Sequence, residues 1–217
     1  KSLNNFLKRL KKNGSKFSYR KIHNKSKKVY EANITVFDAL KKSDYDPKGK
    51  FFLERYVAAH AIMISFEGIP AIYFNSLFGK SNDEAKYIIT GNNRDVNRYK
   101  WNYKNITRKL SDNKTKQSIF YSNITNLLSI RRKQKAFHPN GKRHYINLGS
   151  KLFSFKRVSV DKKQSIICIT NLSSKNQTAK LKKELLNYRD LLNLKTKFKD
   201  KNLLTLKPFQ TVWLSNI

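Results

Sequence analysis

The chain has 217 residues, and 39% of them are hydrophobic, which is enough for one large folded domain or two small ones. This composition excludes a disordered tail. With 47 Lys and Arg against 14 Asp and Glu, the formal net charge is +33, a value that points toward polyanions. The basic residues are nevertheless spread over the whole length, among many Asn and Ile. We attribute the charge to a compositional drift toward Lys, Asn and Ile, and keep a basic nucleic-acid-binding module as the alternative function.

Neither a membrane span nor a secretory signal is expected. The longest apolar stretch, residues 56–66, is shorter than the roughly 20 residues that cross a bilayer, and the first residues lack the apolar region of a signal peptide. Cys168 is the single cysteine and lies in an apolar run, where we expect a buried thiol and no disulfide. This favours a cytoplasmic protein. Because the first residue is Lys1 and not Met, we expect the start to be a cut in a longer sequence.

Two helices are predicted in the first part of the chain. Residues 1–13 carry apolar side chains at spacings of three and four, typical of one helix face. Residues 29–40 are either extended or a loop with a short turn. Residues 51–66 form an almost all-round apolar helix that has to be buried on most sides, and Gly68 and Pro70 end it.

A buried strand is predicted next. Residues 69–74 (IPAIYF) are short, apolar and rich in β-branched and aromatic side chains, as in a parallel strand covered on both faces. A helix, a glycine turn and a buried strand are units of an α/β protein. Residues 75–101 are predicted to be a long polar loop, and residues 113–137 a helix with cations at its C-terminal end.

Beyond His138 the apolar period changes from helical to alternating. Short strands at regular spacing are expected at residues 152–158, 165–171, 177–181, 203–206 and 211–214. The predicted fold is therefore an α/β region, residues 1–137, followed by a small all-β sandwich, residues 138–217.

The chain offers few residues for acid–base chemistry. Asp83 and Glu84 fit a helix start, Asp38 lies in an apolar context and Glu67 in a turn, so no pair of carboxylates stands out. We predict no catalytic residue, no metal site and no cofactor in this chain. The four histidines are scattered along the chain, and most of them are interpreted as structural: His23, His60, His138 and His144.

Polar groups concentrate after the predicted strand. Residues 92–98 (NNRDVNR) bring together amide, guanidinium and carboxylate side chains. In α/β barrels the segments that follow the strands build the active site, so this segment is a candidate for ligand contacts. The alternative is a solvent loop whose Arg and Asp side chains pair locally.

Several ordered blocks resemble one known family. AHAIMISFEGIPAIYFNSLFGKSNDEA (residues 59–85) and TGNNRDVNR (90–98) are similar to the end of the (β/α)8 barrel in the sucrose phosphorylase subfamily of glycoside hydrolase family 13, the α-amylase superfamily. YEANITVFDAL (30–40) resembles the segment after the seventh strand of that barrel. RRKQKAFHPNG (131–141) and LKPFQTVWL (206–214) resemble its last helix and the closing strand of its β-sandwich. The string FNSLFG is closer to glucosylglycerate phosphorylases than to sucrose phosphorylases.

The resemblance implies the C-terminal portion of a TIM barrel and a retaining reaction. An Asp nucleophile would form a β-glucosyl intermediate, a Glu would protonate the leaving oxygen, and phosphate would take up the glucosyl group to give glucose 1-phosphate. By family order these carboxylates precede the segment at which this chain starts. The resemblance therefore implies a part of a phosphorylase that is inactive alone and needs the missing N-terminal barrel segment.

Four site residues carry over by resemblance. Arg94 matches the arginine that holds glucose hydroxyls in the donor subsite, with Asp95 as its supporting neighbour. The loop that alternates between acceptor and phosphate settings matches residues 27–33, where Tyr30 and Glu31 present acceptor contacts. Sucrose phosphorylases tend to have Asp at the position of Lys28 and Gln at that of Glu31, which argues against fructose as the leaving group. The expected partners are a small sugar and inorganic phosphate. A non-catalytic homologue or gene remnant is a further alternative.

Overall fold

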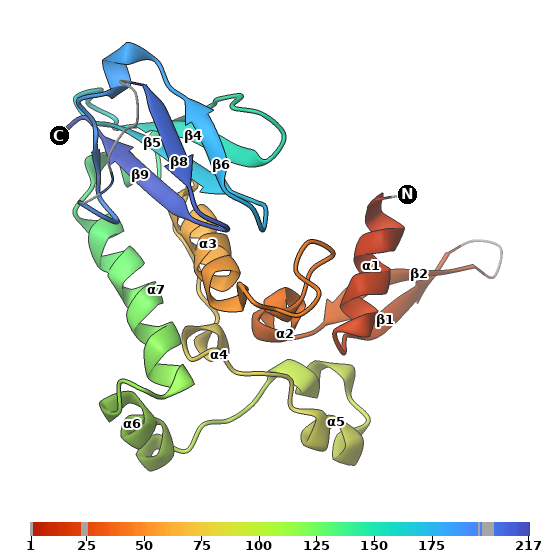
Figure 1. Ribbon diagram of the computed structural model, residues 1–217. Helices are drawn as coiled ribbons and strands as arrows, with labels where there is room; N and C mark the ends of the chain where they lie inside the picture. Colours follow the sequence, from red (N-terminus) through yellow and green to blue (C-terminus); the bar gives the residue numbers. More distant parts are fainter. Residues whose placement is uncertain (1, 23–25, 195, 197–201) are drawn as a thin grey trace. The chain divides into compact units, whose positions relative to one another are not determined.

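The computed structural model describes residues 2–22, 26–194, 196 and 202–217, so His23 lies outside the described residues (Figure 1). The chain divides into two compact units. Unit 1 comprises Lys1–Phe52 and Ile72–Tyr121, and unit 2 comprises Leu53–Ala71 and Ser122–Ile217. The domain division near His138 stays a prediction. Within the described ranges, no helix combines the length and apolar character that a membrane span requires.

Unit 1 is built from short elements and one hairpin. Its helices are α1 (Ser2–Lys12), α2 (Val36–Lys41), α4 (Phe74–Leu77), α5 (Glu84–Thr90), η1 (Asn93–Asn97) and α6 (Tyr103–Ser111), and its strands are β1 (Lys16–Lys21) and β2 (Lys27–Asn33). The helix predicted at residues 1–13 is confirmed, and Gly14 follows it at a positive φ of 94°. The segment left open at residues 29–40 contains the end of β2 and most of α2.

Three aromatic rings pack against one another in unit 1. Phe37 meets Phe52 edge-on at 4.6 Å between ring centroids, and both rings lie within 5.7 Å of the ring of Phe120. Gly79 lies against this cluster, since a Cβ atom at this position would come 2.5 Å from Cδ2 of Phe120. The close approach and the positive φ of 55° both require glycine here.

Two long helices begin in unit 1 and continue into unit 2. They are α3 (Phe52–Ser65) and α7 (Lys116–Arg132), followed in unit 2 by the short helices η2 (Lys135–Phe137) and η3 (Lys183–Leu185). Both long helices were predicted, and the predicted start of α7 is three residues early. The predicted burial of α3 is confirmed at Tyr56, Ala61 and Ile64, whereas Met63 is exposed.

The C-terminal strands of unit 2, coloured from green through teal to blue in Figure 1, form two antiparallel sheets. The five-stranded sheet has the order β3-β4-β5-β9-β7, and β6 pairs with β8. Leu152, Ile167 and Leu214 of the large sheet share one core with Leu204 and Leu206 of β8. All five predicted strands are confirmed, and β3 and β7 were missed. The strands are β3 (Lys142–Tyr145), β4 (Leu152–Val158), β5 (Ser165–Asn171), β6 (Gln177–Lys180), β7 (Arg189–Asp190), β8 (Leu203–Leu206) and β9 (Thr211–Ser215).

The edges of the large sheet have a distinct composition. All four residues of β3, Lys142, Arg143, His144 and Tyr145, are exposed. The opposite edge strand, β7, has only two residues.

Two buried arginines of unit 2 bind the carbonyl oxygens at the end of α3. Arg157, fully buried on β4, donates from Nη1 to the Ser65 carbonyl at 2.7 Å and from Nη2 to the His138 carbonyl at 2.8 Å. Arg131 donates from Nη1 to the Ile64 carbonyl and from Nη2 to the Gly68 carbonyl at 2.9 Å. Carbonyls at a helix C-terminus lack hydrogen-bond donors within the helix and carry partial negative charge. The two guanidinium groups supply both the donors and a compensating positive charge.

The predicted parallel strand at residues 69–74 is wrong for this structure. Residues 69–73 belong to no helix or strand, Phe74 begins α4, and every strand pair within the described ranges is antiparallel. A parallel strand needs neighbouring strands to receive its backbone hydrogen bonds, and no described strand pairs with this segment. Ile69 is accordingly 84% exposed.

The long loop predicted at residues 75–101 is also wrong, because the structure has α4, α5 and η1 there. The side chain of Asp83 caps α5 by accepting from the Lys86 amide, and Asn92 caps η1 by accepting from the Arg94 amide. Gly91 ends α5 in the left-handed region. Capping residues, and not an apolar period, define these short helices.

Candidate functional site

The site residues predicted by resemblance lie in unit 1, on β2 and η1. The two elements are tied to the same hairpin, because Asn93 of η1 donates from Nδ2 to the Phe17 carbonyl of β1 at 3.1 Å. On β2, Asn33 is buried and donates to the Lys16 carbonyl at 3.3 Å. Val96 of η1 is fully buried, and its carbonyl accepts from the Asp83 amide at 2.7 Å. These contacts fix the backbone that carries the candidate side chains.

Arg94 and Glu31 meet although 63 residues separate them. Nε of Arg94 lies 3.1 Å from Oε1 and 3.2 Å from Oε2 of Glu31. The Arg94 side chain is 49% exposed and that of Glu31 is 30% exposed, so the pair is open to solvent. A guanidinium beside a carboxylate offers both donors and acceptors, which is what sugar hydroxyls require.

Tyr30 occupies a β-bulge beside this pair. Ser18 pairs with Glu31 and Tyr19 pairs with Val29, which leaves Tyr30 as the extra residue of β2. Bulges redirect side chains and are frequent beside active sites. The Tyr30 side chain is 60% exposed.

A cavity of about 640 Å³ on the hairpin is lined by Tyr30 together with three cations, Arg20, Lys21 and Lys28. Arg20 and Lys28 are directly opposite each other across the two strands, as are Lys21 and Lys27. Like charges that face each other across a sheet are destabilising unless an anion compensates them. The hairpin therefore offers a place for an anion beside Tyr30.

The Asp95 side chain forms its ion pair with α5. Its Oδ1 lies 3.3 Å from Nζ of Lys86 on α5. Hydrogen bonding to the Thr90 hydroxyl, followed by the hydrogen bond and charge of Lys86, lowers the pKa of Asp95. The carboxylate is thus held as an anion that fixes η1 to α5, and the structure gives it no contact with Arg94, Glu31 or Tyr30 among the described interactions. Lys86 was missed in the sequence, where no pattern marks it.

A polar cluster missed in the sequence links the start of α2 to the segment before α5. The Asn82 side chain accepts from the Thr35 amide at 2.9 Å, and the Asn82 amide donates to Oδ2 of Asp38 at 2.6 Å. Thr35 also caps α2 by accepting from the Asp38 amide at 3.2 Å. Asp38, which the sequence placed in an apolar context, is therefore a structural acceptor. The spacing Thr35 to Asp38 is the one available sequence signal, because it is that of a helix cap.

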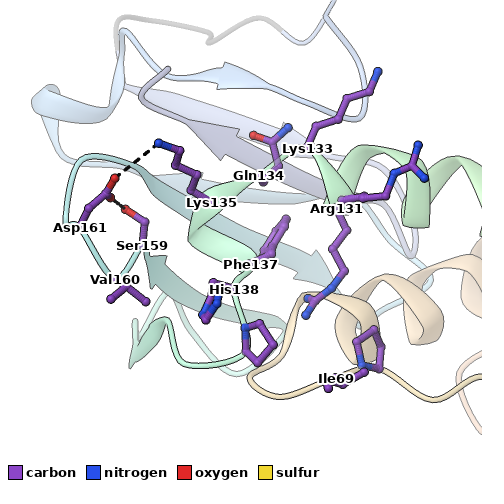
Figure 2. Close-up of a pocket in the computed structure, with 13 residues that line it drawn as sticks. Ile69, Arg131, Lys133, Gln134, Lys135, Phe137, His138, Ser159, Val160 and Asp161 are labelled. Carbon is purple, nitrogen blue, oxygen red and sulfur yellow. Dashed lines mark hydrogen bonds and ion pairs between the residues drawn. The ribbon is translucent and has the colours of Figure 1, made fainter.

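Unit 2 has a cavity of about 740 Å³ that the sequence did not indicate (Figure 2). Its lining includes apolar Ile69, Phe137 and Val160 and several cations. Figure 2 shows Lys135 extending toward Asp161, at 3.7 Å, while Lys133 points away from Phe137. The cations do not converge, so this cavity lacks the arrangement of an anion site.

No group of three or more metal-ligating side chains occurs among the residues that the structure describes. His60 and His144 do not belong to a common site in the described part of the chain. His60 is buried in α3, with Nδ1 2.9 Å from the Tyr56 carbonyl, and His144 is exposed on β3.

No protein-family model matches the chain. The crystal structure of sucrose 6F-phosphate phosphorylase from Thermoanaerobacter thermosaccharolyticum superposes with a TM-score of 0.61 at 20% identity, covering 78% of this chain and 31% of that one. The fold is thus similar to that of glycoside hydrolase family 13 enzymes.

The sequence comparisons are more specific. Over 192 residues, 85% of this chain, it is 32% identical to the glucosylglycerate phosphorylase of Escherichia coli (strain K12). Over 110 residues, 51% of this chain, it is 30% identical to the sucrose phosphorylase of Agrobacterium vitis. The matches cover 32% and 20% of these relatives, so the chain spans about a third of the first and a fifth of the second. The chain is homologous to glucosylglycerate phosphorylases and sucrose phosphorylases, as the resemblance implied.

Proposed function

We propose that this chain is the C-terminal part of a retaining phosphorylase that transfers an α-glucosyl group from glucosylglycerate or sucrose to inorganic phosphate. The observation that carries the proposal is the 32% identity to a glucosylglycerate phosphorylase over 85% of the chain. In this role, residues 1–137 are the end of a (β/α)8 barrel and residues 138–217 a sandwich domain.

The proposed reaction has two steps. A carboxylate attacks the anomeric carbon, the glycosidic bond breaks, and a carboxylic acid protonates the leaving oxygen. Phosphate oxygen then attacks the same carbon and releases the carboxylate, which gives α-glucose 1-phosphate with net retention. Both catalytic carboxyl groups come from a part of the longer protein that precedes this segment, and this chain alone is inactive.

The residues of this chain bind and orient the substrates. Arg94 donates to glucose hydroxyls. Asp95 forms an ion pair with Lys86 and so fixes η1, the helix that carries Arg94. Glu31 and Tyr30 contact the acceptor, and the cationic cavity beside Tyr30 supports an anionic ligand, either phosphate or the carboxylate of glycerate. The basic residue at position 28 suits glycerate better than fructose, because Lys28 can pair with a carboxylate.

Phosphate-dependent release of glucose 1-phosphate tests the proposal. We expect none from this chain and release from a protein extended to the full length of its relatives, with glucosylglycerate or sucrose as donor. In the extended protein, Arg94→Ala removes a charged hydrogen bond worth about 1.5 to 3 kcal/mol, so activity falls at least about tenfold. Arg108→Ala, at an exposed position of α6, is the matched control and keeps full activity. Release of glucose 1-phosphate by this chain alone, or an unchanged rate in Arg94→Ala, contradicts the proposal.

A further inference from the structure

A second cavity of unit 2, about 390 Å³ in volume, shares no lining residue with the candidate site. Its walls come from α3, α7, the turn between β8 and β9, and residues 192–193. All of these belong to one compact unit. The volume is within the range of about 300 to 1,000 Å³ that small-molecule sites occupy.

The floor of this cavity is apolar. Val57 and Ala61 of α3 and Leu127 of α7 line it, and Ala61 and Leu127 are buried. Phe209, from the β8–β9 turn, closes one side and is 6% exposed. Such a surface suits the C–H face of a ligand.

The wall formed by the β8–β9 turn is rigid. Phe209 has a positive φ of 53°, a strained conformation for an aromatic residue that persists only where its surroundings impose it. Here the Asn171 side chain donates to the Lys207 carbonyl at 2.8 Å, and the Phe209 amide donates to the Ser173 carbonyl at 3.3 Å. The guanidinium carbon of Arg55 lies 5.1 Å from the centre of the Phe209 ring. A wall fixed in advance reduces the entropy that ligand binding has to overcome.

The rim of the cavity is polar but electrically balanced. It has the amides of Asn123, Asn126 and Gln210, with one carboxylate, Glu54, and one ammonium, Lys207. Amide side chains both donate and accept, so they match hydroxyl groups, which do the same. A purely apolar ligand would remove water from these amides without replacing the lost hydrogen bonds, and the balanced charges give no preference for an ion.

We propose that this cavity binds a neutral sugar, a monosaccharide or one ring of a disaccharide, at a site separate from the one that contains Arg94. The sugar packs its C–H face on the half-buried Val57 and directs its hydroxyls to Asn126 and Gln210. This inference does not depend on the proposed phosphorolysis, because binding at this site needs no residue outside unit 2.

Titration of the full chain, labelled with ¹⁵N, with glucose and with sucrose tests the proposal. We expect saturable shifts of the side-chain amide signals of Asn126 and Gln210, with at least one of the two sugars. Asn126→Ala weakens this binding at least tenfold, and Val57→Phe, which fills the floor, abolishes it. Asn187→Ala, an exposed asparagine of unit 2 outside the cavity, is the matched control and leaves the affinity unchanged. The amide spectrum of each variant shows whether it is folded.

Three results overturn the inference. The first is the absence of saturable shifts up to about 100 mM of either sugar, far above the millimolar range of weak sites. The second is an unchanged affinity in folded Asn126→Ala and Val57→Phe. The third is loss of the same shifts in Arg94→Ala, which would place the bound sugar at the candidate site of unit 1. Failure of phosphorolysis in the extended protein, with these shifts intact, refutes the proposed function alone.

Discussion

Nη1 of Arg157 donates to the carbonyl oxygen of Ser65 at 2.7 Å, which joins the end of β4 to the C-terminus of α3 across 92 positions of sequence. The same guanidinium reaches the carbonyls of His138 and Gly141. Burial lowers the pKa of Arg157 and of Arg131, because it disfavours the charged guanidinium. The carbonyl oxygens that accept hydrogen bonds from these groups offset part of that cost. Three separate segments of unit 2 therefore depend on one side chain.

Arg157→Met keeps most of the side-chain volume but removes the donors. Buried carbonyls left without a partner cost about 1 to 3 kcal/mol each, so we expect unit 2 to lose about 2 kcal/mol or more of unfolding free energy. Urea denaturation followed by circular dichroism measures the change. Arg189→Met, at an exposed position of β7, is the control and changes stability by less than about 0.5 kcal/mol. Equal stability of the two variants would show that the carbonyls find other donors.

Gly79→Ala introduces both a clash and backbone strain. The new Cβ would lie 2.5 Å from Cδ2 of Phe120 at a φ of 55°, so we expect a loss of about 2 kcal/mol or more in unit 1. Gly91→Ala separates the two effects, because its φ is 64° but no atom lies within 4 Å of its Cβ. This control loses only about 1 kcal/mol, the strain of the left-handed region. Urea midpoints of the two variants give the comparison, and equal losses contradict the predicted clash.

The contact between Glu31 and Arg94 is expected to add little to the stability of unit 1. Exposed ion pairs contribute about 0.2 to 1 kcal/mol, and both side chains are open to solvent. A double-mutant cycle with Glu31→Gln and Arg94→Gln should therefore give a coupling energy below about 1 kcal/mol, which 1 M salt reduces further. A coupling above about 2 kcal/mol would show that the pair holds unit 1 together.

His60 makes the stability of unit 2 depend on pH. Burial lowers its pKa from 6.5, opposed in part by the hydrogen bond to the Tyr56 carbonyl. The unfolded chain therefore takes up the proton first as the pH falls, so stability is complete above pH 6.5 and declines as the pH falls from there through the folded-state pKa. Urea midpoints at pH 7 and pH 5 should differ more in the native chain than in His60→Gln. The same difference in both would exclude His60 as the cause.

Cys168 is expected to be unreactive while unit 2 is folded. The thiol is fully enclosed, and burial raises its pKa, so the thiolate that attacks alkylating reagents is scarce. Iodoacetamide should label the native chain far more slowly than the urea-unfolded chain. Destabilising variants such as Arg157→Met should speed the labelling, and fast labelling of the native chain would contradict the buried position.

Sequence patterns predicted the elements in which an apolar periodicity extends over many consecutive residues. The apolar residues of α3 and the alternation in β4 and β5 gave bounds within one residue of those observed. α5 and η1 were missed because their caps and not their apolar spacing define them. The strand at residues 69–74 was wrong because strand formation depends on neighbours that its own residues do not encode.

The candidate site was only partly predictable. Resemblance named Arg94, Asp95, Tyr30 and Glu31, and their roles stay predictions. The contact between Arg94 and Glu31 joins distant segments, so periodicity could not find it. The bulge at Tyr30 depends on the register between two strands, which no single segment determines.

The exposed basic residues of β3 have a consequence for association between molecules. An unpaired sheet edge is a template on which another chain can add a strand. A second molecule approaching β3 edge to edge would bring the basic side chains of the two strands close together, and the repulsion would oppose pairing. At the other edge, the two residues of β7 offer too short a ladder. The large sheet is thus protected at both ends against growth into a fibril.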